Sequence, residues 1–152
     1  MVSSNNKVLV MILTKISIVS MMLIVTTAIH ACGMLLAMKF SRHRDETGKA
    51  YGVCKRILRL SFIVICMFIV SLIEVTAWAL TYLKIGAIDG FEKAIYFSMV
   101  TYTTLGYGDV LLDENWRVLA SYQAANGIIM FGWTTAIILY AIREVYFEGH
   151  VE

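Results

Sequence analysis

The stretch Thr101-Tyr-Thr-Thr-Leu-Gly-Tyr-Gly-Asp109 has two glycines spaced two residues apart, after a pair of threonines and before one acid. In an extended strand, successive residues face opposite sides, and so do their carbonyl groups. If alternate residues take a positive φ, the carbonyls point to one side instead, and glycine takes a positive φ without steric cost. Gly106 and Gly108 have the spacing that this backbone needs. The stretch can therefore form an extended backbone whose carbonyl oxygens face one side.

The chain around this stretch is strongly apolar. It has 152 residues, of which 59% are hydrophobic and 16% charged, whereas soluble domains average roughly 45–50% apolar and 25% charged residues. Such a composition excludes a disordered chain, and a soluble domain of this size could not bury so much apolar surface. Three cysteines are too few for a disulfide scaffold. A net charge of +2 gives no indication of a nucleic-acid partner. The composition therefore predicts a membrane protein, and the apolar runs described next predict an all-α membrane protein.

Three apolar runs are long enough to cross a membrane as helices, and they cover residues 16–38, 60–83 and 118–142. Between the last two, residues 90–102 predict a helix of roughly 20 Å, which is too short to span. Asp89 and Glu92 predict a capping box at its start. Because non-helical backbone at membrane depth must be buried in protein or line a water-filled path, this short helix and the glycine stretch after it indicate a re-entrant loop that lines a pore.

In this setting, residues 101–109 resemble the selectivity filter of tetrameric potassium channels, with Leu105 in place of the commoner valine. The resemblance implies bound K⁺ ions and no other cofactor. It implies a homotetramer with fourfold cyclic symmetry in lipid, because four such strands are needed to surround an ion. The implied filter residues are Thr104, Leu105, Gly106, Tyr107 and Gly108, of which the first four hold K⁺ through carbonyl oxygens and the Thr104 hydroxyl. The implied filter supports are Thr103, Asp109, Tyr96 and Phe97, the last two as an aromatic pair that braces Tyr107.

The last apolar run resembles the pore-lining inner helix of two-span bacterial potassium channels in its segment Gly127-Ile-Ile-Met-Phe-Gly132. Gly127 is either a flexible hinge or a site of close helix packing. Two amides in the same run, Gln123 and Asn126, are predicted to bond between helices. The residues expected to line the cavity or form a gate are Gly127, Ile128, Phe131, Thr135 and Leu139, of which Leu139 lies nearest the cytoplasmic constriction.

Two polar residues inside the first and second apolar runs are candidates for modulation. Glu74 is the one acid within a predicted span, which makes it a functional candidate by default. The structural alternatives for it are a bond to the short helix or an ion pair with Lys15. His30 could sense pH near its unperturbed pKa of about 6.5, or it could be a simple hydrogen-bonded histidine.

Charge placement predicts the topology. Seven of the 13 basic residues lie between positions 39 and 59, which indicates a cytoplasmic loop by the positive-inside rule. Three spans then place the N-terminus outside and the C-terminus in the cytoplasm of a multi-pass cell-membrane protein. The expected organisation is an additional N-terminal span at 1–40, a basic cytoplasmic loop at 41–59, a pore domain at 60–142 and a short tail at 143–152. The pore domain would comprise an outer helix at 60–83, a pore helix at 90–102, a filter at 103–109 and an inner helix at 117–142.

Three functions are compatible with these features. The first is a potassium-selective channel that conducts K⁺ passively through a tetrameric pore. The others are a weakly selective cation channel and a non-conducting accessory subunit of a larger channel. No nucleophile–base pair or metal cluster is visible in the sequence, so an enzyme is not expected.

Overall fold

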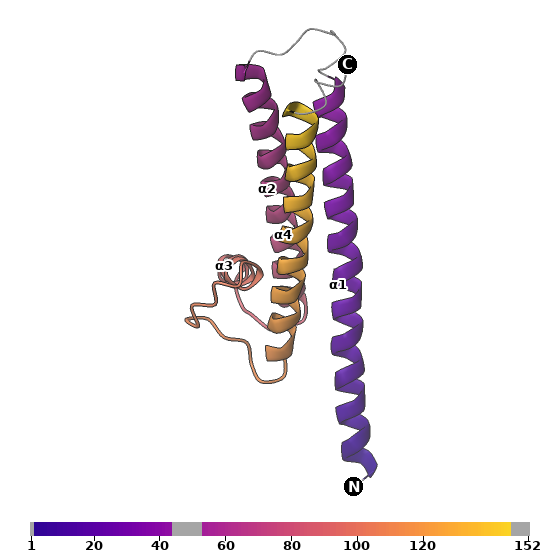
Figure 1. Cartoon of the computed structure of the whole chain (residues 1–152). Helices are drawn as coiled ribbons and strands as arrows, with labels where there is room; N and C mark the ends of the chain where they lie inside the picture. Colours follow the sequence, from indigo (N-terminus) through magenta and orange to yellow (C-terminus); the bar gives the residue numbers. More distant parts are fainter. Residues whose placement is uncertain (1, 44–52, 147–152) are drawn as a thin grey trace. The chain divides into compact units, whose positions relative to one another are not determined.

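The structure is a computed structural model that describes residues 2–43 and 53–146. Four helices make up most of this part of the chain: α1 (Val2–His43), α2 (Val53–Lys84), α3 (Phe91–Tyr102) and α4 (Arg117–Tyr146) (Figure 1). The described residues contain no strand. The predicted all-helical class, with three long helices and one short one, is therefore confirmed at this level.

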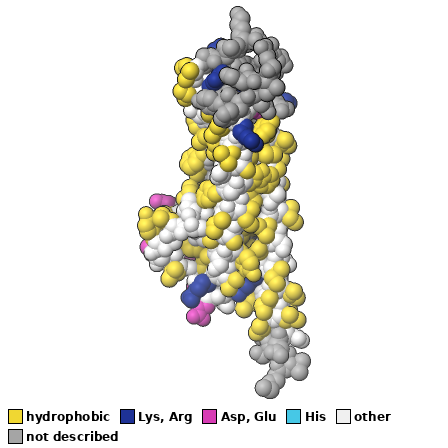
Figure 2. Space-filling model, in the orientation of Figure 1, with side chains coloured by type: hydrophobic (Ala, Val, Ile, Leu, Met, Phe, Trp, Pro, Cys, Tyr) yellow, Lys and Arg dark blue, Asp and Glu magenta, His cyan; other side chains and the backbone are white. Residues whose placement is uncertain are grey.

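The three long helices are apolar enough to cross a membrane over Val8–Lys39, Val53–Lys84 and Arg117–Glu144. In Figure 2, hydrophobic side chains cover most of the visible face of these helices, whereas charged side chains gather near their ends and around α3. Since water is the poorer solvent for such a surface, the long helices are suited to lipid. The protein is a membrane protein.

All three long helices extend past the apolar runs that predict them, and α1 (Val2–His43) does so at both ends. Helix α2 begins at Val53, inside the segment expected to be cytoplasmic loop, and α4 continues to Tyr146, inside the expected tail. Lys, Arg, Leu and Glu all favour helix, and no glycine or proline interrupts these extensions. The remainder of the predicted loop, at 44–52, and of the predicted tail, at 147–152, lies outside the described residues.

The predicted capping box at the start of α3 is wrong. The N-cap is Gly90, with a φ of 90°, and no side chain caps the helix. Glu92 is then the second residue of the helix, one position too early to reach back as a capping-box acid does. The sharp turn at this point needs the positive φ that glycine supplies, so the chain enters α3 one residue later than Asp89 would allow.

The chain forms two compact units, and Met1–Thr27 with Val75–Ile128 make up the first. In this unit the ring of Tyr82 on α2 meets Phe97 on α3 edge-on, at 5.3 Å between centroids. A Schellman turn ends α2, in which the amide of Ala87 donates to the carbonyl of Tyr82 and Gly86 has a φ of 67°. The buried core draws on all four helices and includes Val19, Met22, Trp78, Tyr82, Ala94, Phe97, Leu112 and Leu119.

The second unit comprises Ala28–Glu74 and Ile129–Glu152. Its buried apolar core contains Ile63, Met67, Val70, Ile137 and Ala141, with partly buried Ile29, Met34, Leu60 and Trp133 against it. Helices α1 and α2 approach closely here, because a Cβ on Gly33 would lie 2.2 Å from Cγ2 of Val70. The small residue lets two backbones pack in an apolar setting, where close van der Waals contact is a main source of helix association.

We expect Gly33→Ala to lower the melting temperature of the protein in detergent. The new methyl would overlap Cγ2 of Val70, a side chain that a helix holds in one rotamer, and overpacking of this kind costs about 1–3 kcal/mol. The matched control is Gly132→Ala, where nothing lies within 4 Å of the new Cβ, and where alanine should stabilise the helix by up to about 1 kcal/mol. Equal melting temperatures for the two variants would contradict this contact between α1 and α2.

Candidate functional site

The backbone that follows α3 alternates between ordinary and left-handed conformations. Thr104, Gly106 and Gly108 have φ values of 60°, 57° and 79°. The two glycines adopt the positive φ that their spacing predicts. The positive φ of Thr104 was not predicted, since a β-branched residue rarely takes this conformation. Strain of this kind persists only where the surrounding structure imposes it, and it is typical of functional sites.

The carbonyl of Val100, in the last turn of α3, anchors this backbone. It accepts hydrogen bonds from the amides of Leu105 at 3.0 Å and of Gly106 at 3.2 Å. The amide of Thr103 donates to Met99, and the Thr103 hydroxyl donates to the same carbonyl at 2.9 Å. The end of α3 therefore fixes the position of the glycine stretch.

A side-chain bond joins the first half of α3 to the far end of the stretch. The hydroxyl of Tyr96 donates to Oδ2 of Asp109 at 2.7 Å. This bond lowers the pKa of the Asp109 carboxyl below its ordinary value, because it stabilises the carboxylate. The same bond raises the pKa of the Tyr96 hydroxyl, which must keep its proton in order to donate. Two of the predicted filter supports, Tyr96 and Asp109, are thus in direct contact.

Phe97 is the other member of the predicted aromatic pair, whose support of Tyr107 stays a prediction. It is buried against Tyr82 in the core of the first unit, where it supports α3. The side chains of Leu105 and Tyr107 are 55% and 68% exposed in the single chain. An open hollow of about 310 Å³ lies between α3, the glycine stretch and α4. Its lining is mostly apolar and includes Phe97, Val100, Val110, Ala120 and Ala124.

Gly127 on α4 packs against the end of α3. A Cβ at this position would lie 2.1 Å from the carbonyl oxygen of Tyr102 and 3.0 Å from its carbonyl carbon. The atoms in the way are backbone atoms, so they cannot turn aside as a flexible side chain would. Of the two interpretations that the sequence leaves open for this glycine, the structure therefore supplies direct evidence for close packing.

The other predicted cavity or gate residues are exposed in the single chain. Ile128, Phe131 and Leu139 have exposed fractions of 61%, 39% and 57%. Thr135 is also exposed, and its hydroxyl donates to the carbonyl of Phe131 at 2.9 Å. Each of these side chains can therefore face either lipid or a cavity that several chains enclose.

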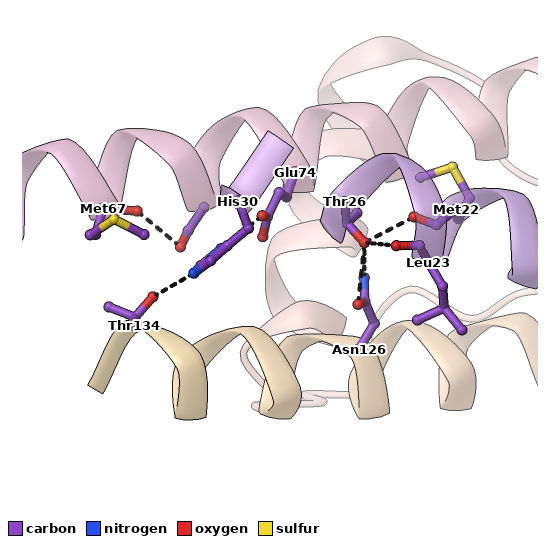
Figure 3. A network of polar contacts seen from close by, with 9 residues as sticks. Met22, Leu23, Thr26, His30, Met67, Glu74, Asn126 and Thr134 are labelled. Carbon is purple, nitrogen blue, oxygen red and sulfur yellow. Dashed lines mark hydrogen bonds and ion pairs between the residues drawn. The ribbon is translucent and has the colours of Figure 1, made fainter. Parts of the chain in front are cut away.

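Both predicted inter-helix amides are fully buried and bond between helices, as expected. Asn126 on α4 donates to the hydroxyl of Thr26 on α1 at 3.1 Å (Figure 3). That hydroxyl also lies 2.9 Å from the carbonyl of Met22, one turn earlier in α1. Gln123 bonds to Tyr82 on α2 and Ser98 on α3.

Glu74 pairs with His30, which the sequence does not predict. Its Oε1 lies 3.0 Å from Nδ1 of the imidazole, and both side chains are fully buried. On the other side of the ring, Nε2 lies 3.3 Å from the hydroxyl of Thr134 on α4 (Figure 3). The ring also contacts Trp133, at 5.0 Å between centroids. The histidine thus links α1 to α2 and α4 in the second unit, as the hydrogen-bonded alternative for His30 predicts.

The fold and the site define a membrane protein with a short helix and a strained, glycine-containing stretch between two membrane-length helices. A family model described as "Ion channel" matches residues 68–144, about half of the chain, and this range contains α3, the glycine stretch and most of α4. The chain belongs to this ion channel family, whose members carry a pore loop between two spans. No curated protein and no solved structure matches the chain.

We expect Gly127→Ala to reduce or abolish the current through single channels, because the new methyl would displace the backbone at the end of α3. A hinge would behave differently, since alanine there would change the fraction of time that the channel is open and leave the single-channel current unchanged. Recordings in planar bilayers separate the two results. Gly132→Ala, which meets no neighbour within 4 Å, serves as the control.

The bond between Tyr96 and Asp109 should be insensitive to pH over the neutral range. Because the pKa of Asp109 is lowered, the bond's contribution is lost only as pH falls through that lowered value. Because the pKa of Tyr96 is raised, it is lost at high pH only as pH rises through that raised value. The difference in melting temperature between wild type and Tyr96→Phe should therefore stay constant from about pH 5 to about pH 9. A difference that disappears inside this window would contradict the contact.

Proposed function

We propose that the protein is a potassium-selective channel that conducts K⁺ passively, with residues 104–108 as its selectivity filter. The observation that carries the proposal is the positive φ at Thr104, Gly106 and Gly108. An alternation of this kind turns successive carbonyls toward one side of an extended backbone, and rings of carbonyl oxygens replace the hydration shell of K⁺. The proposed ligands are the carbonyls of Thr104, Leu105, Gly106 and Tyr107, together with the Thr104 hydroxyl.

The direction of α3 favours a cation at the inner end of this filter. The helix ends at Tyr102, directly before the proposed ligands. Its last carbonyls form the negative end of the helix dipole, which stabilises a nearby positive charge by roughly 0.3–1 kcal/mol. As a re-entrant helix of 12 residues, α3 would aim this end into the membrane, where the low dielectric makes such terms larger than in water.

A homotetramer would supply the oxygen ligands on the remaining sides of the ion, which one chain lacks. One strand offers oxygen ligands on one side of an ion, and four strands around a common axis enclose it. The exposed side chains of Leu105 and Tyr107, and the apolar hollow between α3, the glycine stretch and α4, support this assembly. A neighbouring copy would cover these surfaces and hold the filter from behind. In the same assembly, Ile128, Phe131 and Thr135 would line a cavity, and Leu139 would narrow its cytoplasmic end.

The additional helix α1 belongs to each subunit in this proposal. In the first unit it is bonded to α4 through Thr26 and Asn126, and in the second through His30 and Thr134. With residues 39–59 in the cytoplasm, the N-terminus of α1 is outside and the C-terminus of α4 is inside. The filter then faces outward, and Asp109 lies at its external mouth, where a carboxylate attracts cations.

The test is the reversal potential of the purified protein in bilayers with K⁺ on one side and Na⁺ on the other. A selective channel should reverse far from zero, on the side set by the K⁺ gradient. A weakly selective cation channel should reverse near zero, and an accessory subunit should carry no current. Either of the last two results would overturn the proposal.

Gly106→Ala and Gly108→Ala should each abolish the K⁺ current, because an L side chain at these φ values is strained and disturbs the alternation of carbonyls. Gly86→Ala is the matched control. Its φ of 67° imposes the same backbone strain, but it lies at the end of α2, with no atom within 4 Å of a new Cβ. Unaltered K⁺ conduction in the two filter variants would refute the assignment of the filter.

A further inference from the structure

One buried amide joins three helices of the first unit. Gln123 on α4 is fully buried, and its Oε1 accepts a hydrogen bond from the hydroxyl of Tyr82 on α2 at 2.8 Å. Its Nε2 donates to Ser98 on α3 twice, to the hydroxyl at 2.7 Å and to the backbone carbonyl at 3.2 Å. Since a buried polar group without a partner is costly, a side chain with this many bonds is held in one orientation.

The hydrogen-bond partners of Gln123 determine the orientation of its amide group. The hydroxyl of Ser98 donates its proton to the carbonyl of Val75 on α2 at 2.7 Å. Its oxygen is therefore available to Gln123 only as an acceptor, so the NH₂ group must face Ser98 and the carbonyl must face Tyr82. Only a side chain with a donor on one side and an acceptor on the other satisfies both neighbours.

Ser98 lies close to the point where α3 holds the filter backbone. Val100, two residues further along the same helix, accepts the amides of Leu105 and Gly106. A helix of 12 residues moves nearly as a rigid body, so a shift of Ser98 carries the Val100 carbonyl with it. Core packing alone restrains such sliding weakly, because dispersion contacts are non-directional and individually small. The hydrogen bonds of Gln123 and Ser98 are directional and resist it.

We infer that Gln123 is a positioning residue for ion selection: its amide sets the location of α3 between α2 and α4, and thereby the spacing of the filter carbonyls. The inference rests on the proposed function. Gln123 bonds to α3 through Ser98 and acts on the filter through Ser98 and Val100. A residue of the inner helix that touches no proposed ligand thus controls the discrimination between K⁺ and Na⁺.

The chain provides a matched control three residues away. Asn126 is also a fully buried amide on α4, but it bonds to Thr26 on α1. Replacing either amide by an apolar residue of similar volume, Gln123→Met or Asn126→Leu, removes one buried inter-helix bonding group. The two changes should destabilise the protein alike, and only the first should disturb α3. Tyr82→Phe is a second control, because it removes one bond of Gln123 and leaves the bonds to Ser98 in place.

The experiment measures the K⁺/Na⁺ permeability ratio from reversal potentials of purified channels in bilayers, together with their melting temperatures in detergent. Gln123→Met should lower the permeability ratio about tenfold, which corresponds to about 1.4 kcal/mol. Ser98→Ala should lower it less, because the amide can still bond to the Ser98 carbonyl. Asn126→Leu and Tyr82→Phe should lower the melting temperature and keep the wild-type ratio.

Each outcome is decisive. A wild type that does not discriminate K⁺ from Na⁺ overturns the proposed function and the inference with it. A selective wild type with an equally selective Gln123→Met overturns the inference alone. An equal loss of selectivity in Asn126→Leu also overturns it, because the effect would then follow from any lost contact of α4. If Gln123→Met does not assemble, the test rests on Ser98→Ala. A wild-type K⁺/Na⁺ permeability ratio in Ser98→Ala would then overturn the inference.

Discussion

Three left-handed backbone conformations, at Thr104, Gly106 and Gly108, are the constraint on which the rest of the first unit depends. Local energetics do not favour such a run, above all at the β-branched Thr104. Its neighbours compensate at both ends. The carbonyl of Val100 holds the amides at the start of the run, and the hydroxyl of Tyr96 holds Asp109 after it. The close approach of Gly127 to Tyr102 keeps the end of α3 against α4. Strain in one short segment is thus balanced by bonds and contacts that come from two helices.

Hydrogen bonds between polar side chains orient the apolar helices relative to their neighbours within each unit. The hydrophobic effect does not hold helices together in lipid, so small residues and hydrogen bonds contribute much of the specificity. The buried polar residues here meet one another: Thr26 meets Asn126, His30 meets Glu74, and Gln123 meets Tyr82 and Ser98. Each pair fixes the rotation and the height of one helix relative to its neighbour within a unit. Apolar surface alone would leave both of these free to slide.

The sequence predicts the elements better than it predicts their partners. Three long apolar runs and a short segment between them suffice to predict four helices, and the spacing of Gly106 and Gly108 predicts their positive φ. The N-cap of α3 was missed by one residue, because the φ of 90° at Gly90 is decided by the turn before the helix and not by the acids around it. The partner of Glu74 was also missed. The apolar run shows that this acid lies inside a span. The residue that it faces on another helix depends on how the two helices are rotated and shifted along their axes, and no local sequence pattern gives this information. The same holds for Gln123, whose burial could be foreseen and whose bond to Ser98 could not.

The pairing of His30 with Glu74 has a consequence for how the chain enters the membrane. An ionisable side chain in the middle of a spanning helix is costly to insert, and Glu74 is the one acid in the apolar run of α2. Its imidazole partner lies on α1, which is synthesised first, and the two groups meet at 3.0 Å only when both helices are in the bilayer. The contact with His30 therefore offsets part of the cost of placing Glu74 inside an apolar helix. The additional helix α1 thus supplies, from outside α2, a polar partner for the one acid in that apolar run.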